Sequence, residues 1–280
     1  METIRCKICG TELEPEAGAA VCVCGVCGAR QILPGAEGDA LREREQRAAE
    51  AAARRAAFRT PGQIVTFGSY PQRADCEACR ASEERDPIEW VVLEARGSES
   101  LLLSRHALDC RPYHSGTDSV TWETCALRGW LNGEFLQTAF DSRERGAILT
   151  TTVDNSDAQC CGRWTTTGGN DTRDKVFLLS YAEAHRFFGL EDWHDAGSTD
   201  NVRPRAAATP YAVSRGAFVS GDWQTADGEP SCWWWLRLPG KFQDDGSVVR
   251  EDGAMLYFNV SRHNGCVRPA ILLDTASDIL

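Results

Sequence analysis

The sequence lacks any long hydrophobic run. No stretch of the 280 residues approaches the roughly 18 consecutive apolar residues that a membrane-spanning helix requires. The N-terminal segment METIRCKICG also has no apolar core of the kind found in secretory signals. We therefore expect a cytoplasmic protein without membrane contacts. In that compartment, 13 cysteines indicate metal ligands and free thiols rather than a disulfide framework.

Positive charge is scarce. The chain has 30 Lys and Arg against 41 Asp and Glu, which gives a formal net charge of -11. Such a balance argues against a protein whose whole surface binds nucleic acid, so we do not expect nucleic acid as a partner. The hydrophobic content of 42% is ordinary for a globular chain, and the length suffices for one large domain and a small module.

Common catalytic motifs are missing as well. The sequence contains no HExxH, no phosphate-binding P-loop and no GxSxG. We therefore expect a binding protein rather than an enzyme.

Two short segments near the N-terminus match each other: CKICG at residues 6–10 and CGVCG at residues 24–28. Each is a Cys-x-x-Cys turn followed by glycine, which lets backbone amides turn towards the thiolates. Two such knuckles offer four sulfurs to a tetrahedral Zn²⁺ and leave no open coordination position. The pattern predicts a structural zinc ribbon with the ligands Cys6, Cys9, Cys24 and Cys27. Cys22 is an alternative to Cys24, but Cys24 restores the repeat.

The remaining cysteines fall into two groups. Four lie in polar loops, where a second zinc site and free thiols are both open interpretations: Cys76, Cys79, Cys160 and Cys161. Four others lie in apolar or aromatic surroundings: Cys110, Cys125, Cys232 and Cys266. We interpret this second group as small buried side chains.

Composition divides the chain into three parts. Residues 1–34 form the cysteine module, and residues 35–60 are dominated by Ala, Arg and Glu, which favour a linker helix. Residues 61–280 form the main domain. It begins with β-rich runs at residues 64–70, 88–95 and 100–104 and continues with helical patterns at residues 122–140 and 181–188, the latter with Ser180 and Glu183 as a capping box. The pattern predicts an α+β domain.

Seven motifs follow one another in the main domain. They are FGSYPQ (67–72), PIEWVVLE (87–94), ALDCRPY (107–113), WETCALRGWLN (122–132), DKVFLLSYAEA (174–184), WWWLRLPG (233–240) and CVRPAILL (266–273). In this order they resemble a bacterial domain family of uncharacterised function with a C-type-lectin-like fold, over about residues 63–273. Cys266 stands where that family usually has glycine. The resemblance implies a mixed core of strands with two helices and a long irregular loop region.

Such domains are also similar, more distantly, to the variable proteins of diversity-generating retroelements. These display diversified residues on a C-type-lectin fold, which implies that residues 241–265 form a face for a protein or other macromolecular ligand. The predicted ligand-facing residues are Phe242, Arg250, Tyr257, Asn259, Ser261, Arg262 and His263. If residues 255–260 form a strand, Leu256, Phe258 and Val260 share one side, and we expect that side to be buried.

Two alternatives remain. The same fold hosts formylglycine-generating enzymes, which implies an oxidase that uses Cys232 and Cys266, with His263 as a candidate base. A zinc-ribbon adaptor for nucleic acid is the other alternative, although the acidic charge disfavours it.

The run Trp233-Trp234-Trp235 makes a further prediction. A strand would place Trp234 on one face and its two neighbours on the other. Arg237 and Arg268 follow in the WLRLPG and VRPA motifs. Either would be costly to bury alone, so we expect hydrogen bonds to carbonyl groups or to a carboxylate.

Overall fold

A computed structural model describes residues 4–73 and 85–280. The chain divides into two compact units, Met1–Ala56 and Ala57–Ile279. Helix α1 (Ala36–Phe58) contains the boundary between them, and its residues are mostly good helix formers. Within the described part of the chain, no helix has the length and hydrophobicity needed to span a membrane. Cys76 and Cys79 lie outside the described residues.

The first unit is built on a short antiparallel hairpin. Strand β1 (Val21–Val23) pairs with β2 (Arg30–Ile32), and the CGVCG segment forms the turn between them. Its small core contains Cys6, Leu13 and Cys24. Apolar side chains are few here, so a bound metal would be needed to supply much of the stability.

The second unit is a mixed α+β structure with two five-stranded sheets. The first sheet is antiparallel throughout, in the order β3-β4-β5-β17-β9. Its strands are β3 (Ile64–Tyr70), β4 (Asp86–Arg96), β5 (Glu99–Ser104), β17 (Ala270–Asp274) and β9 (Val176–Phe177). The three β-rich runs predicted from the sequence are therefore confirmed. The last strand, β17, lies between β5 and β9, so the C-terminal motif is part of the core.

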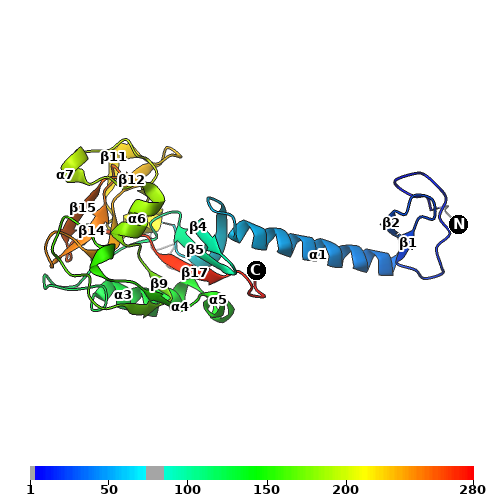
Figure 1. Ribbon diagram of the computed structural model, residues 1–280, viewed down its shortest axis with the longest axis horizontal. Helices are drawn as coiled ribbons and strands as arrows, with labels where there is room; N and C mark the ends of the chain where they lie inside the picture. Colours follow the sequence, from blue (N-terminus) through cyan, green and yellow to red (C-terminus); the bar gives the residue numbers. More distant parts are fainter. Residues whose placement is uncertain (1–3, 74–84) are drawn as a thin grey trace. The chain divides into compact units, whose positions relative to one another are not determined.

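The second sheet has the order β15-β14-β13-β16-β6. Its strands are β15 (Met255–Asn259), β14 (Asp245–Val249), β13 (Trp234–Pro239), β16 (Cys266–Val267) and β6 (Asp109–Cys110). All neighbours are antiparallel except β13 and β16. Figure 1 shows β14 and β15 at the end of this unit opposite to β4, β5 and β17. Strand β15 is one edge strand of this sheet, and β6 is the other.

Smaller elements complete the unit. One small sheet contains β10 (Ala206–Ala207), β12 (Pro230–Cys232) and β11 (Val219–Gln224), and another contains β7 (Thr151–Val153) and β8 (Thr172–Asp174). The short helices are α5 (Ser142–Ala147), α7 (Trp193–Ala196), α8 (Pro210–Ser214) and the 3₁₀ turn η2 (Asp157–Gln159).

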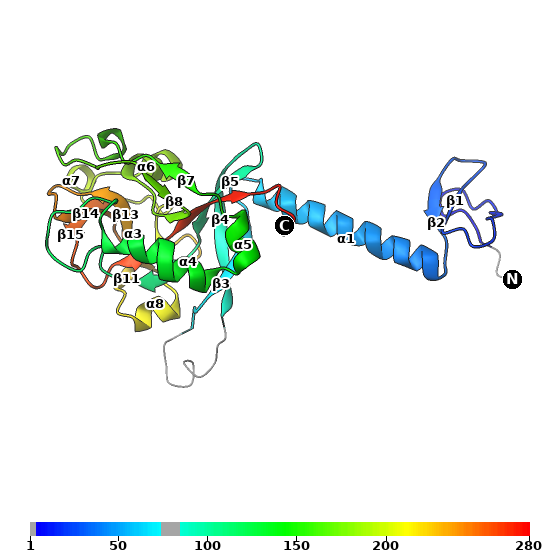
Figure 2. The same ribbon diagram turned by 90° about the horizontal axis from the view of Figure 1, so that it is seen from below.

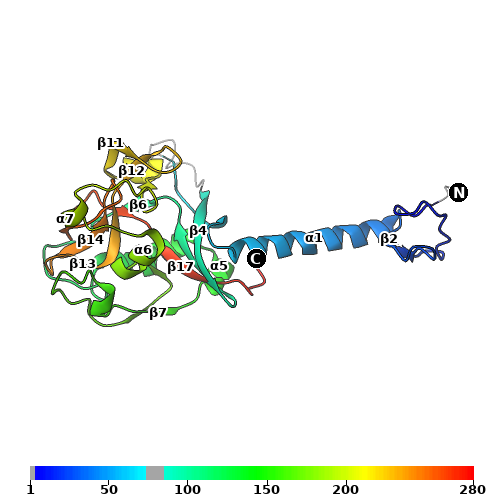
Figure 3. The ribbon, with the colours of Figure 1, turned by 45° about the horizontal axis from the view of Figure 1, so that its top comes forward.

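Both helices predicted for the main domain are present. Helix α3 (Ala126–Trp130), a π turn at Leu131–Phe135 and α4 (Leu136–Ala139) form one continuous helical segment (Figure 2). Gly133, a weak helix former, lies in the π turn. Helix α6 (Tyr181–Phe188) has the predicted capping box of Ser180 and Glu183, and Figure 3 shows it between β13 and β17.

The three tryptophans of the WWWLRLPG motif are all buried, as expected. Trp233 packs against Trp235 with ring centroids 5.0 Å apart, whereas Trp234 lies on the other side and under the guanidinium group of Arg268. The indole N–H of Trp234 donates to the carbonyl oxygen of Pro204 at 3.1 Å. A carbonyl partner thus satisfies the polar group of a buried indole.

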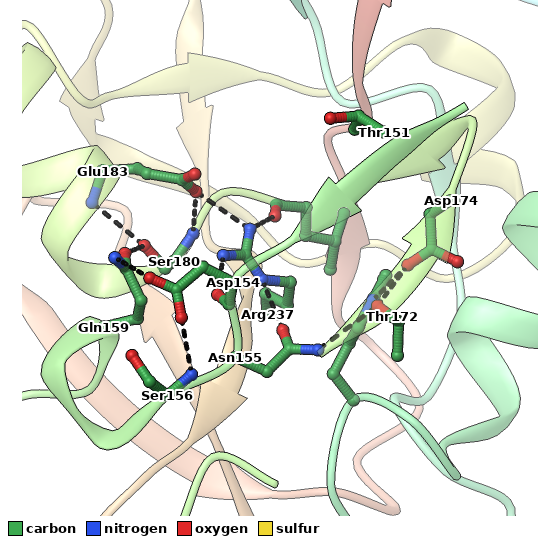
Figure 4. A network of polar contacts seen from close by, with 12 residues as sticks. Thr151, Asp154, Asn155, Ser156, Gln159, Thr172, Asp174, Ser180, Glu183 and Arg237 are labelled. Atoms are coloured by element: carbon green, nitrogen blue, oxygen red, sulfur yellow. Dashed lines mark hydrogen bonds and ion pairs between the residues drawn. The ribbon is translucent and has the colours of Figure 1, made fainter. Parts of the chain in front are cut away.

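Arg237 of the same motif is fully buried and anchors a polar network (Figure 4). Its Nη1 donates to Oε2 of Glu183 at 2.9 Å and to the carbonyl oxygen of Leu178 at 2.7 Å. Its Nε donates to Oδ1 of Asn155 and its Nη2 to the carbonyl oxygen of Asp154. These partners confirm the expectation for Arg237, and they tie β13 to α6 and to the loop after β7.

Arg268 of the VRPA motif is also buried, and no carboxylate among the described residues pairs with it. Its Nε donates to the carbonyl oxygen of Ser104 at 2.9 Å and its Nη1 to that of Pro204 at 3.4 Å. Burial lowers the pKa of Arg268 to about 10. The expectation of carbonyl partners is confirmed here too, and the arginine ties the end of β5 to the loop before β10.

Gly265 stands against the tryptophan pair, and we expect Gly265→Ala to destabilise the protein. A methyl group at this position would overlap the Trp235 ring and lie 2.7 Å from Trp233. Overpacking of this kind costs about 1–3 kcal/mol. Urea unfolding measures the loss, with Gly129→Ala in α3 as the control because its added methyl group meets no atom within 4 Å. Equal stability of the two variants would contradict the packing described here.

Candidate metal centre and candidate ligand face

Four cysteine sulfurs of the first unit meet at one point. The Sγ atoms of Cys6, Cys9, Cys24 and Cys27 all lie within 4.8 Å of one another. The Sγ atoms of Cys6 and Cys27 are 3.6 Å apart, as are those of Cys9 and Cys24. Such a group is close enough to hold a metal ion, and four thiolates are a tetrahedral donor set. The predicted ligand group is thus confirmed as a cluster that could bind metal.

The two knuckles have the same backbone geometry. The amide of Gly10 donates to the carbonyl oxygen of Cys6 at 2.8 Å, and that of Gly28 donates to Cys24 at 2.9 Å. Both glycines have a left-handed φ, 75° and 71°, which side chains other than glycine rarely adopt. This is the physical reason for the repeated glycine after each Cys-x-x-Cys turn.

Cys22 lies outside the metal-ligand group. It is in β1, and its Sγ contacts the carbonyl oxygen of Val23 at 3.7 Å. The preference for Cys24 over Cys22 is therefore confirmed, because Cys24 occupies the tight turn of the knuckle and Cys22 the strand before it.

Cys160 and Cys161 differ from the expectation of thiols in an open loop. Both side chains are buried, and burial raises the pKa of each thiol, that of Cys160 to about 11. The Sγ of Cys161 contacts Oδ2 of Asp192 at 3.9 Å. Residues 4–73 and 85–280 contain no group of potential metal ligands besides the four cysteines of the first unit. A second zinc site that joins Cys160 and Cys161 to Cys76 and Cys79 stays a prediction, because Cys76 and Cys79 lie outside the described residues.

A cluster of five aromatic rings lies at the surface beside β15, and we call it the Tyr257 cluster. The ring of Tyr257 contacts those of Trp164, His194 and Phe242, with centroids 5.2, 5.8 and 6.3 Å away. Trp193 completes the cluster by packing on His194 at 5.5 Å. Phe242 is 55% exposed and Trp193 37% exposed, so the cluster is open to a partner.

Three chain segments position the Tyr257 cluster. Thr166 donates its hydroxyl to the carbonyl oxygen of Gly240 at 2.9 Å, which holds the Trp164 loop against the turn after β13. Gly240 has no room for a side chain, because a Cβ there would overlap Tyr257. The carboxylate of Asp192 caps α7 by accepting from the amide of His194 at 2.9 Å. The rings are therefore held by a rigid base, as in many binding loops.

Charged groups surround this cluster. The guanidinium group of Arg163 pairs with the carboxylates of Asp192 and Asp195, and that of Arg250 lies 5.5 Å from the Trp193 ring centroid. Burial, followed by the charge of Asp244, raises the pKa of Asp245.

The structure brings three of the predicted ligand-facing residues together. Phe242 and Tyr257 belong to the Tyr257 cluster, and Arg250 lies against it. Arg250 is only half-exposed because its guanidinium group also pairs with Glu251 and Asp252.

The other predicted residues lie elsewhere around β15. Asn259 donates to Oδ2 of Asp244 at 3.3 Å and accepts the hydroxyl of Ser261 at 2.7 Å. Arg262 lies over the ring of Phe258 at 4.2 Å, on the side of β15 opposite to Tyr257. His263 is exposed, and its carbonyl oxygen accepts from the thiol of Cys110. The residues are thus divided between two sides of the edge strand.

Burial along β15 differs from the prediction that one side is covered. Val260 is fully buried, as predicted, but Leu256 and Phe258 are only half-buried. Met255 is fully buried although it shares a side with Tyr257. Met255 is covered because its amide donates to the carbonyl oxygen of Glu191 at 2.7 Å, where the chain enters α7. Phe258 packs on Trp233 but remains accessible beside Arg262. Contacts with neighbouring segments, rather than the alternation of side chains between the two sides of β15, determine which side chains are covered.

Sequence reasoning missed three members of the Tyr257 cluster: Trp164, Trp193 and His194. They lie about 60 to 90 residues before Tyr257, in loops outside the segment 241–265. One signal was present, because Trp164 and Trp193 occur in polar surroundings where a large apolar side chain is unexpected.

Cys232 and Cys266 lie side by side in the core, and both are fully buried. The contact with Cys232 and then burial raise the pKa of the Cys266 thiol well above its usual value. Burial also raises the pKa of Cys110 to about 12. Reactive cysteines have the opposite properties, a lowered pKa and solvent access. The arrangement fits the interpretation of small buried side chains.

We expect these thiols to resist alkylation in the folded protein. Iodoacetamide at about pH 8 should modify the half-exposed Cys22 while leaving Cys110 and Cys266 unmodified, because little thiolate forms at the buried positions. Mass spectrometry of peptides measures the modification, and protein unfolded in urea serves as the control in which every thiol reacts. Modification of Cys266 as fast as that of Cys22 would favour the oxidase alternative.

Comparison with known proteins assigns much of the second unit to a family. A family model described as a domain of unknown function, DUF6273, matches residues 97–275. No curated protein matches the chain, and no solved structure matches it either. The resemblance to C-type-lectin-like domains therefore stays a prediction. The matched range contains the whole Tyr257 cluster but not the four cysteines of the metal centre. Because it covers more than half of the 280 residues, the chain belongs to the DUF6273 family of domains.

Proposed function

We propose that this protein binds a protein or other macromolecular ligand through the Tyr257 cluster. The observation that carries the proposal is the contact of five rings from three separate segments around Tyr257 at the surface, two of them well exposed. Aromatic side chains give large contact energy with little loss of conformational freedom, and they dominate many binding surfaces.

The family resemblance supports the same proposal. C-type-lectin-like domains carry an irregular loop region on a rigid core, and the variable proteins of diversity-generating retroelements use that region to display binding residues. Here residues 241–265 join two core strands in the same way, since β13 and β16 pair with each other through Trp234 and Cys266. We infer that the second unit is a display scaffold of this kind.

The metal in the first unit is Zn²⁺ in this proposal. A set of four thiolates suits Zn²⁺, and four protein ligands close the coordination sphere, so the ion has a structural role. The ribbon would then be a small folded module next to α1 rather than part of the ligand face.

The proposal predicts that a substitution in the Tyr257 cluster removes a partner. The immobilised full chain should retain a protein from lysate of its host, and Phe242→Ser should lose most of it because the most exposed ring is removed. Phe218→Ser is the matched control, since Phe218 is 44% exposed and lies before β11, outside the cluster. Quantitative mass spectrometry compares the amounts of protein retained by wild type, Phe242→Ser and Phe218→Ser. The assignment of this face would be contradicted if Phe242→Ser retained as much of the partner as wild type. It would also be contradicted if Phe218→Ser lost as much of the partner as Phe242→Ser.

A further inference from the structure

Strand β15 has an open edge beside the Tyr257 cluster. It is the last strand of its sheet and pairs with β14 alone. The amide of Val260 donates to the carbonyl oxygen of Asp244, and the amide of Arg250 donates to the carbonyl oxygen of Ala254. These two bonds place the residues of β15 that hydrogen-bond to β14 at even-numbered positions. The amide and carbonyl groups of Tyr257 and the amide of Asn259 therefore point away from β14.

One end of this edge is already paired. Asp192 forms a parallel β-bridge with Met255, and the amide of Met255 donates to the carbonyl oxygen of Glu191. The chain then turns into α7 at Trp193 and leaves the edge. Among the hydrogen bonds of residues 4–73 and 85–280, none engages the amide or carbonyl group of Tyr257. An added extended segment would continue the pairing that residues 191–192 begin.

The two sides of β15 also suit an added strand. On one side lies the Tyr257 cluster, and on the other lie Phe258 and the Arg262 guanidinium group above its ring. Side chains of an extended peptide alternate between the two sides of a sheet. A peptide at this edge would reach both sets of residues, whereas a ligand resting on one side would reach only one.

Charge around the edge is negative. Residues 163–164, 191–195 and 241–262 carry seven Asp and Glu against four Lys and Arg. Residues 61–280 as a whole carry 32 Asp and Glu against 21 Lys and Arg, so the excess of the entire chain lies in the main domain. A ligand with basic side chains would be favoured at this surface.

We propose that the ligand is an extended basic peptide segment of a partner protein, which adds to the edge of β15 at Tyr257 and Asn259 and packs its side chains against the Tyr257 cluster. This inference rests on the proposed function, and it specifies the ligand class. Backbone hydrogen bonds to Tyr257 and Asn259 hold the segment, and the aromatic and acidic side chains select its sequence.

A display library of short linear random peptides, selected on the full chain, tests the proposal. The selected peptides should be rich in Lys and Arg and should bind Phe218→Ser as they bind wild type, but Phe242→Ser at least tenfold more weakly. The best peptide is then made with single N-methyl groups along its backbone. N-methylation at alternate residues should weaken binding by about three- to tenfold, while the residues between tolerate it. Bound peptide should also slow amide exchange at Tyr257 and Asn259.

Each contrary result has a distinct meaning. Binding that depends on Phe242 but is insensitive to the position of the N-methyl group would overturn strand addition and leave the ligand face intact. Binding that is indifferent to Phe242→Ser would contradict both proposals. Selection of acidic or neutral peptides would overturn the basic ligand. Failure to select any peptide would overturn the proposal that the ligand is a peptide. The lysate experiment with Phe242→Ser would then test the ligand face independently.

Discussion

The Cys6→Ser, Cys9→Ser double variant is expected to lose its bound metal, about one Zn²⁺ per chain, and to leave the first unit unfolded. The sulfurs of Cys6 and Cys9 are half of the four-sulfur group, and the core cluster around it is small, with Cys6, Leu13 and Cys24 as its buried members. In zinc-finger peptides the free energy of metal binding, about 10–16 kcal/mol, is also the free energy of folding. Elemental analysis of purified protein measures the metal content.

The second unit should remain folded in this variant. Near-ultraviolet circular dichroism monitors its buried tryptophans, since all residues 1–34 lack aromatic side chains. Cys22→Ser is the matched control and should keep the metal, because Cys22 lies outside the sulfur group. Full metal content in the double variant would refute the ligand assignment, and loss of the tryptophan signal would show that the two units do not fold independently.

Arg237→Met is expected to destabilise the second unit by about 3–5 kcal/mol, because each buried acceptor that loses its donor costs about 1–3 kcal/mol. Methionine retains much of the side-chain volume, so the loss of stability arises from the broken polar contacts rather than from a cavity. The variant leaves the Glu183 carboxylate, the Asn155 amide oxygen and two carbonyl groups without their donor. Unfolding in urea, followed by tryptophan fluorescence, measures the change in free energy.

Arg186→Met provides the matched control on the same helix as Glu183. Arg186 pairs with Glu94 at 2.8 Å, but its side chain is 50% exposed. Exposed pairs contribute about 0–1 kcal/mol, so this variant should be close to wild type. Similar losses for the two variants would mean that the Arg237 network does not hold β13 and α6 together.

Much of the fold could be predicted from local sequence. The strands of the first sheet, the capping box at Ser180 and the burial of the tryptophan run follow from alternation, capping chemistry and apolar content over a few residues. The π turn at Leu131–Phe135 could not be read in this way, because only the weak helical residue Gly133 marks it. Burial along β15 could not be predicted either, because it depends on the distant segment that enters α7.

The candidate ligand face shows the same division. Phe242 and Tyr257 were identified because they lie between two core strands, whereas Trp164 and His194 join them only through the tertiary structure. Whether these residues bind a ligand stays a prediction. Their contact depends on packing among three loops that are far apart in the chain, and no local pattern records such packing.

By itself, the sequence determined the metal-ligand group, since two Cys-x-x-Cys-Gly turns carry their geometry in adjacent residues and glycine's left-handed φ. It also determined that Arg237 and Arg268 need partners, because the cost of burying a lone charge is a property of the side chain. Only the tertiary structure decided what those partners are, which residues surround Tyr257, and that β15 ends its sheet with an open edge. The reason is physical: knuckles and caps are made of neighbouring residues, whereas sheet order and aromatic contacts arise when distant segments pack together.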